Sequence, residues 1–362
     1  MKVLHVATMT NSSGVASFLM NYYRNINRGE IQFDFLSTSL SESDYSEEIY
    51  KLGGNIFFVS KYKGHLLEYI INVKNVIENG AYDIIHCHEF LLSVISLSLA
   101  KKKGIKTRII HSHSNYISSK YKRLLVYLFR NFWSLFATDF FACSIEAAHF
   151  LFGKRYKYEI FNNAIEPEKF IFNNTARNDI RNDLRLSKNA FVIGYVARLD
   201  KGKNHFFLIN LFRIIVQENI NAYLLLIGEG TLQEEIKKYV AALGILNNVF
   251  FYGVTKKVHE LYSVMDVFVF PSLFEGFGIV GIEAQCAGLP VIASTNIPKA
   301  MQVTNLVHWL DLEIGAEEWA KKVLEFSMFH KRMNMSKIIT QNGYNIKIEC
   351  KKLEMEYFRL KK

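Results

Sequence analysis

Two glutamates, Glu275 and Glu283, stand eight residues apart on either side of a glycine-bearing turn. A strand-like run at 267–270 precedes the turn, and an apolar, helix-like run at 282–287 follows it. One carboxylate is therefore predicted at the carboxyl end of a buried strand, and the other about two turns into a helix. Because N–H groups at a helix start bind anions, this arrangement suits a ligand with hydroxyl groups at two places and a diphosphate between them. A nucleotide-sugar has these features.

A second strand-to-helix turn carries two cations. Arg198 and Lys203 follow a strand-like run at 191–196 and precede a helical pattern. They can converge on one anion, the arginine with a planar fork and the lysine with a point charge. A solvated basic loop is the alternative, but the carboxyl edge of an α/β sheet is where ligands bind, and this favours an anion site.

Three glycines mark further strand ends: Gly14, Gly228 and Gly253. Each lets a ligand approach the backbone closely, and Gly253 can leave main-chain groups open to a flat base. Each also suits an ordinary turn, so none is specific alone. The first turn lacks the Gly-x-Gly-x-x-Gly fingerprint of dinucleotide-binding proteins.

Histidines form two pairs at strand ends. His111 and His113 lie at the edge where a substrate is expected, and either can be the functional one. His86 and His88 bracket Cys87 and invite a zinc interpretation. No distant ligand pair with suitable spacing supports zinc, so we expect no metal.

The composition is that of a folded protein. The chain has 362 residues, of which 50% are hydrophobic and 14% aromatic, which is enough for two domains with separate cores. Its four cysteines are widely spaced and are expected to be reduced thiols. The first residues are too interrupted for a signal peptide, and no apolar run reaches the roughly 20 residues of a membrane span. We therefore expect a cytosolic protein.

The net charge is +10, and the excess is local. Residues 101–130 contain nine Lys or Arg and no Asp or Glu. Basic residues mixed with Leu, Phe, Tyr and Trp over 101–133 suit a helix on the inner face of an anionic membrane. A domain helix with one core face and one solvated basic face fits equally well. Nucleic-acid binding is not expected, because no nucleic-acid module is present.

Short apolar strands alternate with helical patterns throughout, which predicts an α/β fold with doubly wound parallel sheets. The expected strands are 2–8, 32–36, 56–59, 83–86, 107–111, 140–143, 159–161, 191–196, 223–227, 249–252, 267–270, 291–293 and 306–310. The predicted domains are 1–172 on the acceptor side and 191–342 on the donor side, joined by a polar connection at 173–190. A terminal helix within 343–362 is expected to return to the first domain.

Together these motifs resemble the retaining family-4 (group 1) glycosyltransferases, which have the GT-B architecture of two Rossmann-like domains facing a central cleft. The resemblance covers nearly the whole chain and is strongest over 191–294. It rests on the order of Arg198 and Lys203, then 228–230, then 271–278 with Glu283, then 287–294. Residues 108–114 and 141–144 are similar to the exopolysaccharide and capsule members.

The resemblance implies a role for each matching position. Arg198 and Lys203 would hold the donor diphosphate and stabilise the leaving nucleotide, Glu275 would bind hydroxyls of the donor sugar, and Glu283 would bind the ribose. The remaining donor contacts implied are Gly14, Gly228, Gly253, the backbone N–H groups of Phe277, Gly278 and Ile279, and His111, with His113 as its rival.

The implied reaction moves a sugar from a nucleoside diphosphate, expected to be UDP, to a glycan hydroxyl with retention of anomeric configuration. The expected acceptor is a glycan, carried on a polyprenyl diphosphate, and no metal or other cofactor is expected. Two alternatives stay open: a nucleotide-sugar epimerase of the same fold, and a non-catalytic nucleotide-binding protein.

Overall fold

The computed structural model describes residues 1–10, 13–39, 44–59, 64–90, 92–114, 117, 119–328 and 331–361. Asn11 and Ser12 of the first predicted ligand turn lie outside this set, as do the side chains of Lys120 and Lys122. In the described part of the chain, no helix has both the length and the hydrophobicity needed to cross a bilayer.

The chain divides into two compact units. Unit 1 comprises Met1–Ala164 and Asn345–Lys362, and unit 2 comprises Ile165–Tyr344. The division differs from the predicted connection at 173–190. That segment contains helix α7 (Asn174–Asp183), which begins at an Asn173 side-chain cap and lies within unit 2. Its polar sequence is explained by an ion-pair cluster, because Arg177 and Arg181 reach the carboxylate of Asp266 at 2.6 and 2.7 Å.

Unit 1 is built on a seven-stranded parallel sheet with the order β3-β2-β1-β4-β5-β6-β7. The strands are β1 (Lys2–Val6), β2 (Gln32–Ser37), β3 (Ile56–Phe58), β4 (Ile84–Cys87), β5 (Thr107–Ser112), β6 (Asp139–Ala142) and β7 (Glu159–Ile160). Successive residues alternate between two cores: Val3 and Ile84 belong to one and Leu4 and Ile85 to the other. Because side chains alternate along a strand, each of these strands contributes to both cores, and both faces of the sheet are buried.

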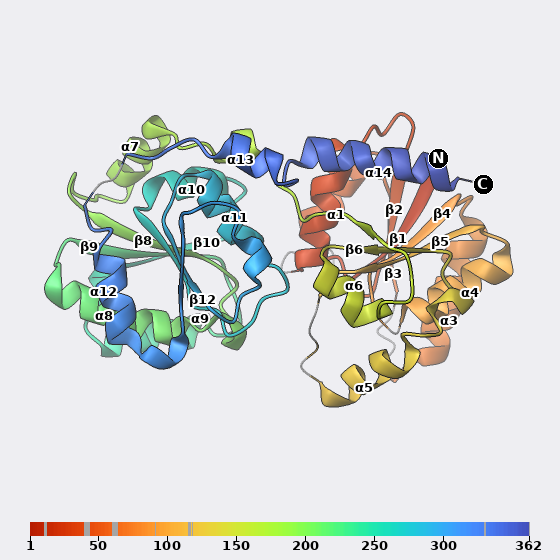
Figure 1. Cartoon of the computed structure of the whole chain (residues 1–362), viewed down its shortest axis with the longest axis horizontal. Helices are drawn as coiled ribbons and strands as arrows, with labels where there is room; N and C mark the ends of the chain where they lie inside the picture. The colour runs from red at the N-terminus through yellow and green to blue at the C-terminus, as the bar shows by residue number, and fades with distance from the viewer. Residues whose placement is uncertain are drawn as a thin grey trace. The chain divides into compact units, whose positions relative to one another are not determined.

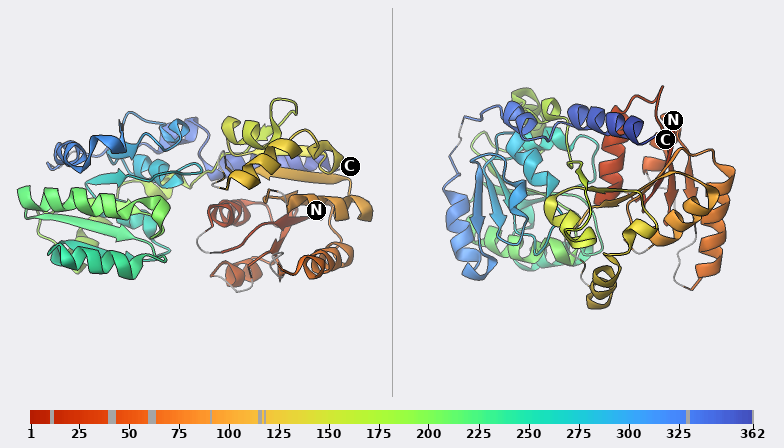
Figure 2. Two further views of the ribbon diagram at one scale, coloured as in Figure 1. Left: turned by 90° about the horizontal axis from the view of Figure 1, so that it is seen from below. Right: turned by 45° about the vertical axis from the view of Figure 1, so that its right-hand side comes forward.

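Helices cover both faces of this sheet (Figure 2). They are α1 (Gly14–Asn25), α2 (Asp44–Lys51), α3 (Leu66–Asn79), α4 (Ser93–Lys103), α5 (Lys120–Phe129), α6 (Ile145–Phe152) and α14 (Ile346–Leu360). Figure 1 shows α14, in blue, beside α1, in red, and both contribute to the core that contains Val3. The last helix of the chain therefore packs on the first unit.

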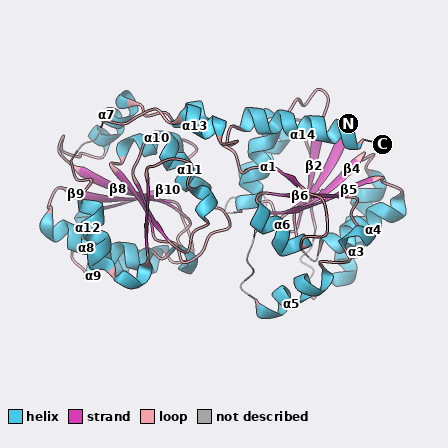
Figure 3. Ribbon diagram, viewed as in Figure 1, coloured by secondary structure: helices cyan, strands magenta, loops and turns pink. Residues whose placement is uncertain are grey.

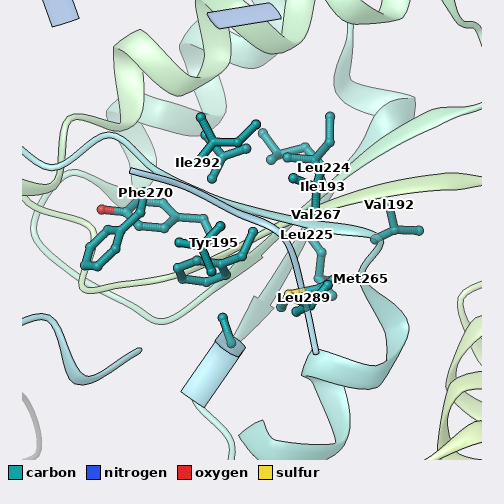
Figure 4. Packing of buried hydrophobic residues seen from close by; sticks show 14 of the residues in the cluster. Val192, Ile193, Tyr195, Leu224, Leu225, Met265, Val267, Phe270, Leu289 and Ile292 are labelled. Atoms are coloured by element: carbon teal, nitrogen blue, oxygen red, sulfur yellow. The ribbon is translucent and has the colours of Figure 1, made fainter. Parts of the chain in front are cut away.

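Unit 2 is built on a six-stranded parallel sheet with the order β10-β9-β8-β11-β12-β13. The strands are β8 (Phe191–Val196), β9 (Ala222–Ile227), β10 (Val249–Gly253), β11 (Val267–Phe270), β12 (Val291–Ser294) and β13 (Val307–Leu310). All four residues of β11 are buried, as expected for a central strand of a parallel sheet. Tyr195 and Phe270 lie close together in the core (Figure 4), with ring centroids 6.1 Å apart.

Helices also flank the second sheet (Figure 3). Besides α7, they are α8 (His205–Glu218), α9 (Gln233–Ala242), α10 (Val258–Val264), α11 (Ile279–Cys286), α12 (Ala316–Leu324) and α13 (Ser336–Gln341). The predicted α/β fold with two doubly wound parallel sheets is confirmed. The four cysteines are buried and free, as expected.

Each sheet has one point at which the direction of winding reverses. In unit 1 it lies between β1 and β4, and in unit 2 between β8 and β11. Loops leaving two adjacent strands on opposite sides of a sheet open a crevice at their carboxyl ends, where α/β proteins bind ligands. These two places are therefore where functional side chains are expected.

Candidate functional site

The reversal point of unit 2 brings together two of the predicted motifs. The backbone N–H of Leu273, after β11, donates to the carbonyl of Gly202, after β8, at 2.9 Å. The Asn204 side-chain amide donates to the carbonyl of Pro271 at 3.1 Å. These two bonds hold the loop with the cations against the loop with Glu275.

Lys203 and Glu275 form an ion pair, with Nζ and Oε1 separated by 2.7 Å. Their side chains are 23% and 12% exposed, so the pair is partly shielded from water but still reachable. The predicted phosphate cation and the predicted sugar-binding carboxylate thus lie side by side. An anionic ligand with hydroxyl groups can contact both, replacing part of their mutual attraction.

Two side chains that the sequence analysis missed hold Glu275 in place. Ser272 donates its hydroxyl to Glu275 Oε1 at 2.8 Å, and Tyr195 contacts the Ser272 hydroxyl at 2.8 Å. Tyr195 also donates to the carbonyl of Lys203 at 2.9 Å. Burial, reinforced by the charge of Glu275, raises the pKa of Tyr195 well above its ordinary value, so it remains a neutral donor.

Arg198, the other predicted cation, lies at the same sheet edge with its side chain 51% exposed. Its Nε donates to Asp200 Oδ2 at 2.8 Å. Asp200 also accepts from the N–H of Gly202 at 3.0 Å and caps the short 3₁₀ turn at Lys201–Lys203. The carboxylate therefore orients both the arginine and the turn that carries Lys203.

Helix α11 begins at the same edge, a short loop after Glu275. Gly278 precedes it with a φ of +87°, a conformation that other L-residues rarely adopt. The first turn closes where the N–H of Gly281 donates to the carbonyl of Gly278 at 2.9 Å. The amides at 278–280 lie before that bond and have no acceptor one turn back within the helix. Phe277 is buried, so only its backbone is suited to a ligand.

Glu283, one turn farther along α11, is half-buried. Tyr262 donates to its Oε2 at 2.6 Å. Burial raises the pKa of Glu283 to about 7, and the hydrogen bond from Tyr262 partly opposes this. The carboxyl group therefore changes charge near neutral pH, which was not foreseen from the sequence.

The three predicted glycines, Gly14, Gly228 and Gly253, occupy different structural environments. A Cβ at Gly228, whose φ is +129°, would lie 2.2 Å from the carbonyl oxygen of Ala197. Gly228 donates its N–H to the carbonyl of Gly253 at 2.9 Å, so these two glycines hold neighbouring strand ends together. Gly14 is the first residue of α1 in unit 1, and a Cβ there would meet nothing within 4 Å.

Unit 1 places the predicted histidines at its own reversal point. His86, His88 and His111 are almost fully buried, whereas His113 is half-buried. The rings of His111 and His113 stack, with centroids 4.1 Å apart. A fourth neighbour, His5 of β1, was not singled out from the sequence, although β1 and β4 pair His5 with His86.

These imidazoles are neutral at physiological pH. Burial lowers the pKa of His113 to about 3, and burial together with the nearby His113 lowers that of His5 to about 3. Burial, reinforced by neighbouring imidazoles, also lowers the pKa values of His86, His88 and His111 well below the ordinary value. The edge of unit 1 is therefore polar but uncharged at its histidines.

Two doubly wound parallel sheets in one chain are the arrangement of the GT-B fold. Residues 12–169 match the family described as "Glycosyltransferase Family 4", and residues 176–344 match "Glycosyl transferases group 1". The chain belongs to this glycosyltransferase family, as the resemblance predicted.

Curated relatives agree with this assignment. The putative glycosyltransferase EpsF of Bacillus subtilis (strain 168) is 33% identical over 357 residues, covering 95% of this chain and 93% of the relative. The capsular polysaccharide biosynthesis glycosyltransferase CapM of Staphylococcus aureus is 31% identical over 253 residues, covering 66% of each chain. A UDP-Gal:α-D-GlcNAc-diphosphoundecaprenol α-1,3-galactosyltransferase of Escherichia coli is 23% identical, covering 81% of this chain and 79% of the relative.

Solved structures share the fold. HepE from Anabaena in complex with UDP and glucose superposes with a TM-score of 0.78 and 16% identity, covering 99% of this chain and 100% of that one. WaaG, a glycosyltransferase involved in lipopolysaccharide biosynthesis, has a TM-score of 0.66 at 14% identity, covering 97% and 95%. At these identities the likeness concerns the fold alone.

Proposed function

We propose that this protein is a retaining glycosyltransferase of exopolysaccharide or capsular polysaccharide synthesis that transfers a sugar from a UDP-sugar to a glycan hydroxyl. The observation that carries the proposal is the Lys203–Glu275 pair at the reversal point of unit 2. In this proposal Lys203 is the cation for the diphosphate and Glu275 the carboxylate for the sugar hydroxyls, and the start of α11 follows Glu275 closely in the sequence. The name of the S. aureus relative supports a polysaccharide pathway, and the UDP-galactose donor in the name of the E. coli relative supports UDP.

In this mechanism Lys203 and Arg198 neutralise the charge that develops on the departing diphosphate. Glu275 orients the donor sugar through its hydroxyl groups, and Glu283 accepts hydrogen bonds from the ribose. The amides at 278–280 contribute further donors. With two cations available, transfer needs no bound metal, so activity in a chelator such as EDTA should equal that in its absence.

Retention is proposed to come from departure and attack on the same face of the sugar, with the donor phosphate accepting the proton of the acceptor. Double displacement would need a carboxylate nucleophile at the anomeric carbon. Glu275 already bonds to Ser272 and Lys203, and Glu283 lies beyond the first turn of α11. This arrangement suits binding roles for both. The anomeric configuration of the product, determined by NMR, tests the point.

The acceptor is proposed to be a glycan on a polyprenyl diphosphate at the inner face of the plasma membrane. A surface on α5 and the segment after it supports this. It exposes large apolar side chains: on α5 Tyr121 (71%), Leu124 (56%) and Leu128 (55%), and after the helix Phe132 (54%) and Leu135 (55%). Val126 on α5 and Trp133 after it are buried instead, so other side chains of the same segment pack in the core. Apolar residues within a basic segment favour an anionic bilayer.

The membrane contact can be tested by flotation with vesicles containing anionic lipid. Leu124→Asn together with Leu128→Asn should reduce the bound fraction several-fold, because buried apolar area drives interfacial binding. The control, Leu246→Asn, alters a 50%-exposed leucine in unit 2 and should leave binding unchanged. Equal flotation of all three proteins would remove the support for a peripheral membrane protein at this surface.

A donor panel tests the function itself. Released nucleotide is measured for several UDP-, GDP- and ADP-sugars with lipid-linked glycan acceptors, followed by mass spectrometry of the lipid fraction. We expect one UDP-sugar to give acceptor-dependent release and a product heavier by one sugar. Conversion of the donor without an acceptor would instead indicate an epimerase, and binding without turnover would indicate a non-catalytic nucleotide-binding protein.

A further inference from the structure

Five imidazoles gather on one face of the sheet of unit 1, around the reversal point between β1 and β4. His5 lies on β1, His86 on β4 and His111 on β5, and His88 and His113 follow the last two by two residues. Because side chains alternate along a strand, residues two apart share a face. This face is the one packed under α1 and α14.

The first of two chains of hydrogen-bonded rings joins His5, His88 and His113. His5 Nδ1 lies 2.9 Å from His88 Nε2, and His88 Nδ1 lies 2.8 Å from His113 Nε2. The rings are thus linked head to tail, and His88 uses both nitrogens. In the described part of the chain, the Nε2 atom of His5 is buried without a partner.

The second chain starts at the carboxyl-terminal helix. The hydroxyl of Tyr357, on α14, lies 2.6 Å from His86 Nδ1, and His86 Nε2 lies 3.2 Å from His111 Nδ1. At the far end, His111 Nε2 is buried and has no partner among the described residues. His111 itself is 2% exposed.

A metal site is the competing explanation. One ring nitrogen from each of His88, His111 and His113 lies within 4.8 Å of the others, and the same holds for His5, His86 and His88. Tetrahedral zinc with Zn–N bonds of about 2.0–2.1 Å would separate its ligand nitrogens by about 3.3 Å. The contacts of 2.8 and 2.9 Å are shorter and fit N–H···N hydrogen bonds. Hydrogen bonding is therefore favoured.

A neutral imidazole carries one N–H and one bare nitrogen, so each chain has only two possible directions. In the first chain, protons on Nδ1 leave a bare nitrogen at His5 Nε2, whereas protons on Nε2 would bury an unpaired N–H there. Buried N–H groups without acceptors are the rarer and more costly case. This favours the Nδ1–H form for His5, His88 and His113.

The second chain runs the other way. If Tyr357 donates to His86 Nδ1, then His86 Nε2–H donates to His111 Nδ1, and only the N–H at His111 Nε2 lacks a partner. The reverse direction would leave two groups unsatisfied, the O–H donor of Tyr357 and the bare acceptor nitrogen His111 Nε2. The first direction is therefore favoured, and His111 carries its proton on Nε2.

We propose that the array holds His111 as the Nε2–H form and His113 as the Nδ1–H form, each presenting an N–H donor to a hydroxyl group of a bound sugar. Tyr357 and His5 are positioning residues that set these forms through His86 and His88. The sugar as ligand rests on the proposed function, whereas the tautomers do not. Helix α14, which carries Tyr357, thereby helps to set the tautomers of the histidines at the carboxyl edge of the unit 1 sheet.

The experiment is NMR of the 362-residue chain labelled with ¹⁵N-histidine, using long-range ¹H–¹⁵N correlations, in which a bare ring nitrogen resonates far downfield of an N–H. Single His→Gln variants assign the rings. We expect Nδ1–H forms for His5, His88 and His113, and Nε2–H forms for His86 and His111. The proposal would be overturned by His111 as Nδ1–H together with His113 as Nε2–H, or by the same form at both rings. Displacement of these signals by one equivalent of Zn²⁺ would also overturn it.

Tyr357→Phe gives a sharper result. Without the hydroxyl, both directions of the second chain leave one unpaired donor and one unpaired acceptor, so His86 and His111 should become mixtures while the first chain is unchanged. Tyr23→Phe is the control, because it removes another hydroxyl of unit 1, which donates to Leu52 O at 3.1 Å. It should alter none of the five rings, and a single tautomer at His111 in Tyr357→Phe would contradict the role of Tyr357.

Transfer activity supplies a separate measurement. Tyr357→Phe should lower kcat/KM about 3- to 10-fold, the range for one weakened hydrogen bond. If Tyr357→Phe does not fold, His86→Gln breaks the same chain and should also change the His111 signal. If the tautomers are as predicted but no sugar is transferred, the proposed function is wrong while the assignment of the tautomers is confirmed. If sugar is transferred but the tautomers differ, the tautomer assignment is wrong while the proposed function is supported.

Discussion

The two units have the same kind of parallel sheet and the same reversal of winding, but they place different chemistry there. At the β8–β11 point of unit 2, Lys203 and Glu275 form an ion pair, and Arg198 lies at the same edge. At the β1–β4 point of unit 1, five uncharged imidazoles form two hydrogen-bonded chains. In each unit the reversal of winding determines where these side chains lie, and the type of side chain determines which ligand group it can bind.

The difference has a physical consequence for binding. Full charges in unit 2 suit a diphosphate, because charge-assisted hydrogen bonds are roughly twice as strong as neutral ones. Neutral imidazoles in unit 1 suit hydroxyl groups, whose orientation depends on which nitrogen carries the proton. Variants in unit 2 should therefore have larger effects on transfer than variants in unit 1.

The largest effect is expected for Glu275→Ala. It removes the carboxylate assigned to the sugar hydroxyls and leaves Lys203 without its partner, so kcat/KM for transfer should fall by about 100-fold. The matched control is Glu235→Ala, an exposed glutamate on α9, which should have normal activity. Near-normal transfer by Glu275→Ala, with an unchanged melting temperature, would contradict the assignment.

Lys203→Ala should follow, with a loss of about 10- to 100-fold in kcat/KM, because one charged contact to the diphosphate disappears. Lys201→Ala is the control, since Lys201 is exposed on the same 3₁₀ turn. Steady-state kinetics with varied donor concentration will separate the two. Equal losses in both variants would indicate a diffuse electrostatic effect rather than a specific phosphate contact.

A smaller effect is expected at the histidines of unit 1. His113→Ala should reduce kcat/KM about 3- to 10-fold, the range for one neutral hydrogen bond. The measurement is the same donor titration, with circular dichroism to check the fold. A loss larger than that of Glu275→Ala would reverse the ranking of the two units. His111→Ala should cause a loss of similar size, and normal transfer by either variant would leave the other histidine as the single sugar contact.

The smallest effect at neutral pH is expected for Glu283→Gln, and it should depend on pH. Because the folded pKa of Glu283 is about 7, wild-type affinity for a UDP-sugar should rise severalfold between about pH 6 and about pH 8, as the carboxylate forms and accepts the ribose hydroxyls. The glutamine variant should show no such rise. Calorimetric titration at the two pH values provides the measurement. The same change in affinity with pH in wild type and in Glu283→Gln would contradict the assignment of Glu283 to the ribose.

The same residue affects stability in a defined direction. A folded pKa raised from 4.5 to about 7 means that the protonated form is favoured by folding. Its contribution is fully present below pH 4.5 and is lost as the pH rises through about 7, by about 1–3 kcal/mol. Glu283→Gln should therefore gain stability relative to wild type at about pH 8 and not at about pH 4.

Much of the fold could be predicted because its signals are local. Every strand was expected within a few residues of its place, since short apolar runs alternate with helical patterns. The division between units was placed too late, because the polar residues of α7 indicated a linker. Arg177 and Arg181 there are instead buried by a distant partner, Asp266.

The sequence named Lys203 and Glu275 as candidates, but it did not predict that their side chains are in contact. The Lys203–Glu275 pair depends on β8 lying beside β11, and this order is not sequential along the chain. Tyr195 resembled an ordinary strand residue, and Tyr357 fell within the predicted terminal helix without being singled out. The spacing of two in His86/His88 and His111/His113 did carry a signal, because such pairs must share a face of the sheet.

The most direct test is calorimetric titration of UDP into the wild-type protein, Lys203→Ala and His113→Ala under one set of conditions. Because the diphosphate is assigned to unit 2 and only a sugar hydroxyl to unit 1, UDP affinity should fall about 10- to 100-fold in Lys203→Ala and stay at the wild-type value in His113→Ala. An unchanged affinity in Lys203→Ala, or an equal loss in both variants, would contradict the division of chemistry between the two units.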